Sequence, residues 1–278
     1  MLLSMYMREF SRNIWAAGTL WYEKDATGIA ATVSYYAIFA ISPLLLLTIT
    51  LTSIFYGRDY VVSIFQEWGS ILGTDLVALL QQAVLNLETI SSGIQIPMLG
   101  IIFFSFMVIV MFNALTSGLH QLWGISHQGF RGWIRKSTRS LVFVVLLEVY
   151  LVFLIGLDKY GDVVSQQGDF LWVFLLQAIV TLFTTMVFFS LVYRVLPRKC
   201  PALTSRLMGG FVAAILFLIA KSFVSWYIGT TPVPGLFGAA GLIVVLLIWV
   251  YVSVAVVYFG AAYAWVVDDT MKISENTD

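Results

Sequence analysis

Long apolar runs separated by short polar segments dominate this chain. An α-helix rises about 1.5 Å per residue, so roughly 20 apolar residues cross the hydrocarbon core of a bilayer. Runs that approach or exceed this length cover residues 28–55, 96–123, 141–157, 170–196, 207–228 and 236–267. The pattern predicts an all-α polytopic membrane protein with six transmembrane helices.

The first run, residues 28–55, is not uniformly apolar. Its first half is small and polar, and the residues that mark it include Ser34, Tyr35 and Tyr36. Ser42 and Pro43 fall near its middle, where the proline lacks the N–H that the carbonyl of Phe39 would accept. One interpretation is a kink that serves packing. The other is a hinge beside a solute path, because broken helices line many transporter binding sites.

The polar segments complete a single membrane domain over residues 1–278. Residues 1–25 place apolar and charged side chains at helical spacing, which predicts a helix lying in the membrane interface. Residues 56–95 are mixed in character and predict short amphipathic helices packed against the bundle in the first external loop. The six-span bundle then occupies residues 28–267. We expect residues 268–278 to form a mobile, acidic polar tail.

The basic residues predict an orientation. Twelve of the 15 lysine and arginine residues lie in the N-terminal segment, the second and fourth connections between spans, and the C-terminal tail, whereas the opposite loops hold only Arg58 and Lys159. Because loops rich in Lys and Arg stay in the cytoplasm, both termini should be cytoplasmic. An even number of spans satisfies that requirement.

Small residues in the last two spans predict close helix packing. Gly209 and Gly210 are each followed four residues later by an alanine, and Gly260 is followed by Ala264 at the same spacing. Such pairs let helix backbones approach where no hydrophobic effect drives association. We interpret them as fold chemistry, with a flexible gate near Gly238 as the alternative.

Composition narrows the class further. Hydrophobic residues make up 60% of the chain and charged residues only 11%, with a mean hydropathy of +0.93. A net charge of zero gives no general attraction to nucleic acid. One cysteine, Cys200, and two histidines supply no recognisable metal-ligand set. Since no nucleophile motif or phosphate-binding loop is present either, we expect no enzyme activity, no cofactor and no metal.

Glu148 and Lys221 are the only charged residues well inside the predicted spans. A charge at mid-helix costs roughly 2.5–3.5 kcal/mol on insertion scales, so such residues usually face the bundle interior and mark pathways. Glu148 is alternatively a satisfied buried carboxyl, and Lys221 a side chain that extends to the outer interface. Further pathway candidates on other spans are Asn113, His120 and Trp249. For His120, a polar residue at a helix end is the favoured interpretation over a proton relay.

Four stretches together form a specific combination: SYYAIFAISPLLLL, ALTSGLHQLWGI, RVLPRKC followed by MGGFVAA, and FGAAGLIVVLLIWVYVSVAVVYFGAAY. The combination resembles the YihY/BrkB family of bacterial inner-membrane proteins, once labelled ribonuclease BN, over about residues 15–267. The resemblance implies a six-span fold in the cytoplasmic membrane and a transporter role. Two positions depart from the family pattern, which usually has Asn at His120 and Glu at Ala262; if that Glu serves a common mechanism, this chain lacks it.

Three classes of function are left. A transporter or exporter of a small polar or amphiphilic solute fits the broken first span and the interior charges, and a lipid or envelope-lipid flippase is a closely related alternative. A structural or envelope-assembly protein without a substrate is the second class, which a dry, filled core would favour. A nuclease is disfavoured, because the basic loops are better explained by topology and anionic lipids. The expected partners are membrane lipids and a solute or lipid substrate, not nucleic acid, and a homo-oligomer is compatible with the chain.

Overall fold

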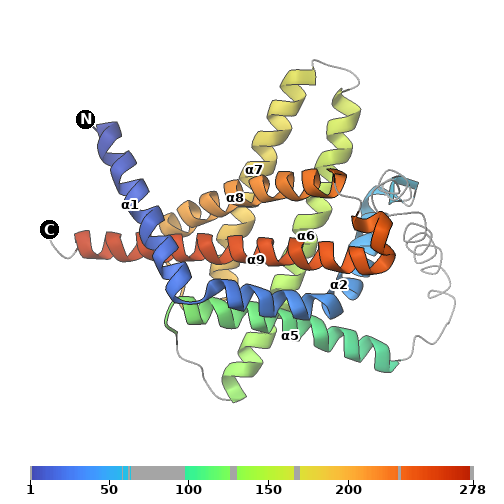
Figure 1. Cartoon of the computed structure of the whole chain (residues 1–278), viewed down its shortest axis with the longest axis horizontal. Coiled ribbons are helices and arrows are strands. Elements are labelled where there is room, and N and C mark those ends of the chain that lie inside the picture. The colour runs from blue at the N-terminus through green and yellow to red at the C-terminus, as the bar shows by residue number, and fades with distance from the viewer. Residues whose placement is uncertain are drawn as a thin grey trace.

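The computed structural model describes residues 2–57, 59–61, 63, 98–125, 130–165, 170–230 and 233–275. The regular elements in these ranges are α1 (Leu2–Glu23), α2 (Ala26–Tyr56), α5 (Met98–Leu122), α6 (Phe130–Ser165), α7 (Phe170–Val195), α8 (Leu203–Thr230) and α9 (Val233–Glu275) (Figure 1). No strand occurs among the described residues. The expected all-α class is therefore confirmed for this part of the chain.

Membrane-spanning character is clear for most of these helices. Four segments are long and apolar enough to cross a bilayer: Lys136–Tyr160, Leu175–Val195, Leu203–Val224 and Ile243–Ile273. The two halves of α2 make a fifth span if they are counted as one bent helix. In α5 the apolar segment Phe106–Leu122 is shorter than these spans. The described residues thus support a multi-pass helical protein with four or five spans. The amphipathic helices expected within 56–95 lie largely outside these residues.

α2 bends where the sequence predicts a break. Its two parts, Ala26–Ile41 and Pro43–Tyr56, are inclined to each other by 56°. Pro43 removes one backbone hydrogen bond, and its ring clashes with the preceding turn, so a sharp bend at this point has a local cause. The bend redirects the second half of α2 toward α6, with which α2 packs.

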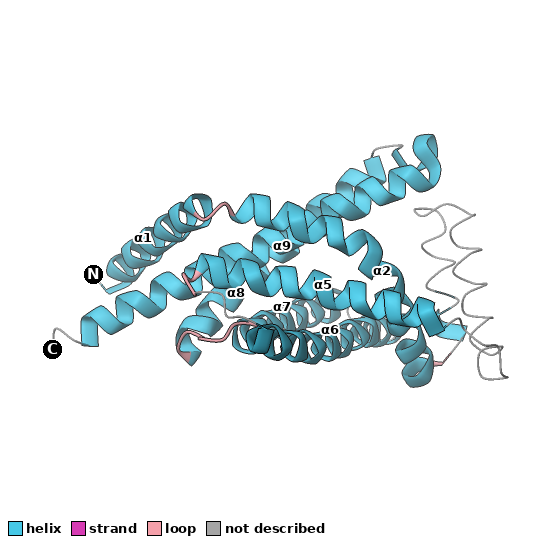
Figure 2. Cartoon of the chain, turned by 90° about the horizontal axis from the view of Figure 1, so that it is seen from below, coloured by secondary structure: helices cyan, strands magenta, loops and turns pink. Residues whose placement is uncertain are grey.

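α9 lies at the centre of the helix packing. It packs along α8, α2 and α1, while α8 also packs on α7 and α2 on α5. In Figure 1, α9 runs across the view, and α6 and α7 form an adjacent pair steeply inclined to it. Figure 2 views that pair from near its ends, with α9 and α5 passing over it. The pair formed by α6 and α7 therefore crosses α9 and does not run along it.

Glycines and hydroxyls set the close contacts of α9. A Cβ atom at Gly209 of α8 would lie 2.5 Å from the carbonyl oxygen of Gly260, so the predicted small-residue packing of α8 on α9 is confirmed. Three side chains donate hydrogen bonds to backbone carbonyls between α9 and its neighbours: Tyr193 to Val257, Trp123, just after α5, to Ala261, and Tyr258 of α9 to Leu115 of α5. These bonds fix the register between α9 and its neighbours.

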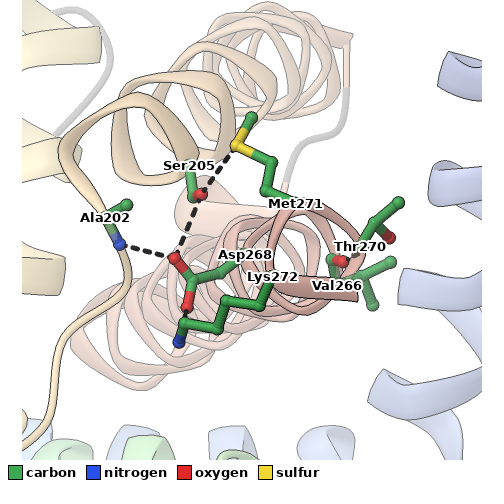
Figure 3. A network of polar contacts seen from close by, with 7 residues as sticks. All are labelled: Ala202, Ser205, Val266, Asp268, Thr270, Met271 and Lys272. Atoms are coloured by element: carbon green, nitrogen blue, oxygen red, sulfur yellow. Dashed lines mark hydrogen bonds and ion pairs between the residues drawn. The ribbon is translucent and has the colours of Figure 1, made fainter. Parts of the chain in front are cut away.

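The C-terminal end of α9 differs from the expected polar tail. The helix continues past Val267 to Glu275, and Asp268 is buried. Asp268 Oδ1 accepts hydrogen bonds from the backbone N–H of Ala202 at 2.6 Å and from Ser205 Oγ at 3.3 Å, and Oδ2 pairs with Lys272 Nζ at 2.5 Å (Figure 3). A carboxylate at the start of α8 satisfies free N–H groups there and complements the helix dipole. This long-range cap ties the last turns of α9 to the start of α8.

Candidate functional site

The bend in α2 presents two threonines to the same side of the helix. Thr48 and Thr52 lie four residues apart in the half that follows Pro43, and side chains at this spacing share a face. Thr52 is only 2% exposed, and Thr48 is half-buried. Pro43 itself is half-buried. The two hydroxyl groups thus lie about one and a half and two and a half helical turns after the break at Pro43.

Glu148 of α6 meets this face. Its side chain is 1% exposed, which confirms that it is buried inside the bundle and does not face the surface. Glu148 Oε2 lies 2.7 Å from Thr48 Oγ1, and the same hydroxyl lies 3.0 Å from the carbonyl oxygen of Leu44. The contact joins the second half of α2 to the middle of α6.

Two buried oxygens at this site have no hydrogen-bond partner among the described residues. They are Glu148 Oε1 and Thr52 Oγ1. Leaving a buried polar atom unpaired costs about 1–3 kcal/mol, and more for a charged group. Thr52 is also unusual because a helical threonine commonly donates to the carbonyl four residues earlier, as Thr48 and Thr50 do. Each of these oxygens is therefore an atom beside which an additional polar group would be stabilised.

The helices packed on α6 supply no counter-charge near its middle. α2 contains no charged residue, α5 contains only His120, and α7 contains only Arg194, both near the C-terminal ends of their helices. Lys221 is exposed on α8 and forms no ion pair with Glu148 within the described part of the chain. The predicted interior charges are therefore not brought together.

A second hydrogen bond joins α6 to α7 near the same level. Tyr150 Oη lies 3.0 Å from Thr185 Oγ1, and the Tyr150 ring stacks on Phe188 with ring centroids 4.1 Å apart. Both side chains of the hydrogen bond are buried. This packing holds α6 on the side away from α2, and so fixes the position of Glu148.

A polar cluster also joins α5 to the first turns of α6. Asn113 donates to Ser137 at 3.1 Å and accepts from Ser140 at 3.0 Å, while Lys136 donates to Ser117. The amide of Asn113 therefore has a partner both as a donor and as an acceptor, and it links α5 to α6. The sequence identified Asn113 but not its partners. Ser137 and Ser140 lie in the first turns of α6, where polar residues are common and do not stand out.

The remaining predicted site residues are dispersed. Ser34 is buried and donates to the carbonyl of Ala30 at 2.8 Å, whereas Tyr35 is 59% exposed and makes edge contacts with Tyr36 and Phe39. Trp249 packs against Phe217 with ring centroids 5.6 Å apart. Gly238 lies in the first turns of α9, and the side chain of Ser42 is outside the described set. Among the predicted residues whose side chains the structure describes, Glu148 is the one with a hydrogen-bond contact to the half of α2 that follows Pro43.

His120 lies near the C-terminal end of α5. Its Nε2 accepts a hydrogen bond of 3.2 Å from the backbone N–H of Arg198, in the connection between α7 and α8. The carbonyl of His120 also accepts from Ile125 at 2.8 Å. The residue thus ties a helix end to a neighbouring turn, which is the favoured interpretation of its sequence position.

Sequence reasoning missed Thr48 and Thr52. Both lie in an otherwise apolar stretch, where a lone hydroxyl usually bonds to its own helix. The available signal was their spacing of four residues just after Pro43, which puts two hydroxyls on one face of a redirected helix. Fold and site together define a multi-pass helical membrane protein with a buried carboxyl beside a broken span.

Comparison with known families agrees with this class. The sequence model of the family described as Virulence factor BrkB matches residues 20–278. The chain therefore belongs to the BrkB family, and the resemblance noted in the sequence is confirmed.

Several relatives carry the name UPF0761 membrane protein. One from Haemophilus influenzae (strain 86-028NP) is 24% identical over 254 residues, covering 89% of this chain and 91% of the relative. One from Mannheimia succiniciproducens is 23% identical over 265 residues, covering 92% and 89%. One from Alkalilimnicola ehrlichii is 26% identical over 244 residues, covering 84% of this chain and 53% of the relative. No solved structure matches the chain.

Proposed function

We propose that this protein moves a small polar or amphiphilic solute across the bacterial cytoplasmic membrane, along a route beside the bend at Pro43. The observation that carries the proposal is the pair of unpartnered buried oxygens, Glu148 Oε1 and Thr52 Oγ1. A bundle that only had to pack would gain from apolar side chains at these positions. Retaining polar groups without partners is explained if water or a solute reaches them during a transport cycle.

The proposal includes the complete topology. Six spans are formed by α2, α5, α6, α7, α8 and α9, with α1 at the membrane interface and both termini in the cytoplasm. α5 has 25 residues and measures about 37 Å, which is long enough to cross the hydrocarbon core of a bilayer, so we count it as the sixth span. The excess of basic residues on one side supports the orientation.

Transport is tested most simply by flux. The purified protein in liposomes should accelerate the movement of at least one member of a panel of osmolytes, ions and fluorescent phospholipids. Pro43→Leu should slow that flux without unfolding the protein, because it restores the backbone hydrogen bond that the bend lacks. Thr50→Val is the matched control, since Thr50 is a half-buried residue of the same half of α2 whose hydroxyl bonds to Leu46 of its own helix. Absence of flux across the panel with oriented protein would contradict the proposal.

The flippase alternative rests on the same site. If only the fluorescent phospholipids in the panel move, the substrate is a lipid and the solute route is wrong. If nothing moves and Glu148→Leu raises thermal stability, the buried carboxyl serves no transport step, and the structural class is favoured.

A further inference from the structure

Thr48 has one hydroxyl proton and two acceptors within reach. Its Oγ1 lies 3.0 Å from the carbonyl oxygen of Leu44 and 2.7 Å from Glu148 Oε2. The bond to Leu44 is the usual one for a helical threonine, and Thr50 and Ser34 form the same bond on α2. The single proton of the Thr48 hydroxyl can serve only one of these two contacts fully. The other becomes a full hydrogen bond if the carboxyl group of Glu148 carries a proton and donates it to Thr48 Oγ1.

The surroundings of Glu148 point in the same direction. An ionised carboxylate that is 1% exposed needs a cation or several donors, whereas among the described residues Glu148 has one hydrogen-bond contact, with the Thr48 hydroxyl. The other charged residues of its own helix are all at least nine positions away in the sequence: Arg131, Arg135, Lys136, Arg139, Asp158, Lys159 and Asp162. The hydroxyl of Tyr150, two residues further along α6, is engaged with Thr185 of α7.

The basic residues of the neighbouring helices are engaged or remote. His120 accepts a hydrogen bond at the end of α5, and Arg194 is exposed near the end of α7. On α2 the only titratable groups are Tyr35, Tyr36 and Tyr56, and in the segment after it Asp59 is exposed. Nothing on α2, α5 or α7 neutralises a negative charge at the level of Glu148.

From this geometry we infer that Glu148 is an exchangeable proton carrier: in the conformation seen here its carboxyl group is protonated on Oε2 and donates to Thr48 Oγ1, which in turn donates to Leu44. Oε1 is then a neutral carbonyl oxygen, whose lack of a partner is less costly than that of a charged one. When water reaches the site, the O–H bond of the carboxyl breaks, the proton passes to water, and the electron pair stays on the carboxylate. Thr48 then donates to that carboxylate in place of Leu44.

This inference deepens the proposed transport function, because it makes a proton the coupling ion of the route beside Pro43. A carboxyl that is protonated in a closed conformation and ionised in a hydrated one binds and releases one proton per cycle. The bend supplies the needed mobility, since the half of α2 that carries Thr48 is joined to the first half across a missing backbone hydrogen bond.

Infrared spectroscopy of the purified protein tests the protonation state independently of transport. At neutral pH the spectrum should contain the C=O stretch of a protonated carboxyl, shifted by exchange into deuterated water and absent from Glu148→Gln. Asp268→Asn is the matched control and should retain the band, because Asp268 is paired with Lys272 and is ionised. Thr48→Val should shift the band without removing it, which keeps the test valid if Glu148→Gln does not fold.

Three results would overturn the inference. They are absence of the band from the wild-type protein, persistence of the band at full intensity in Glu148→Gln, and loss of the band when sodium chloride replaces choline chloride. The last result would assign a metal cation, and not a proton, to the site. Because the band is read without any substrate, a protonated Glu148 in a protein that shows no flux would refute transport alone.

Discussion

Gly209 of α8 and Gly260 of α9 face each other so closely that a Cβ atom on Gly209 would lie 2.5 Å from the Gly260 carbonyl oxygen and 2.6 Å from the Cβ of Ala264. The clash involves backbone, which cannot turn aside as a flexible side chain can. We expect Gly209→Ala to push α8 and α9 apart and to destabilise the protein by roughly 1–3 kcal/mol.

Thermal unfolding in detergent measures this effect. Gly18→Ala is the matched control, because a Cβ atom there would come no closer than 4.0 Å to Phe259. Since alanine favours a helix over glycine by about 1 kcal/mol, the control should be neutral or stabilising. Equal melting temperatures for Gly209→Ala and the wild type would mean that the two helices are not in this contact.

Asp268 links the last turns of α9 to the start of α8 (Figure 3). Asp268→Ala should lower stability by about 1–2 kcal/mol, the usual cost of losing a side chain that caps a helix start. Asp268→Asn should cost less, because an amide oxygen still accepts from Ala202 although the ion pair with Lys272 is lost. Asp269→Ala, at the exposed neighbouring position, should leave the melting temperature unchanged. If Asp268→Ala and Asp269→Ala have the same melting temperature, the cap does not contribute to stability.

His120 is expected to matter for stability and not for transport. Its Nε2 accepts the N–H of Arg198, and such a bond contributes about 0.5–1.5 kcal/mol. His120→Ala should therefore lower the melting temperature modestly, whereas the flux of any solute identified in the panel should persist in folded protein. Loss of flux with an unchanged melting temperature would instead identify His120 as part of the route.

The native Cys200 provides a reporter of topology. It is exposed in the connection between α7 and α8, which the basic residues place in the cytoplasm. A membrane-impermeant maleimide added to sealed right-side-out vesicles should leave Cys200 unlabelled. In a Cys200→Ser background it should label Tyr160→Cys, a position that is 64% exposed near the other end of α6. Labelling of Cys200 in sealed right-side-out vesicles would show that the predicted orientation is wrong.

Much of the helical architecture could be predicted because its causes are local. Apolar run length predicted α2 and α5 to α9, and the missing N–H of Pro43 predicted the bend in α2. The burial of Glu148 was predictable too, since an exposed carboxylate in hydrocarbon is costly. Each of these conclusions needs only the residue and its immediate sequence.

The other features depend on partners far away in the sequence. The contact between Thr48 and Glu148 joins residues a hundred positions apart, and the burial of Asp268 depends on its contact with the start of α8. Lys221 is exposed because of the face of α8 on which it lies, and its neighbours in the sequence do not reveal that face. Helix rotation and tertiary pairing decide all three.

The central claim is that water reaches a buried site at the bend of α2. The most direct measurement is thiol labelling of Glu148→Cys in a Cys200→Ser background with a small charged reagent, applied from each side of the membrane. Val149→Cys is the control, because Val149 is 65% exposed on the surface of α6 that we assign to lipid and should not react with a charged reagent. The account predicts that Glu148→Cys reacts from at least one side and that Val149→Cys does not. A folded Glu148→Cys protein that reacts from neither side would contradict it.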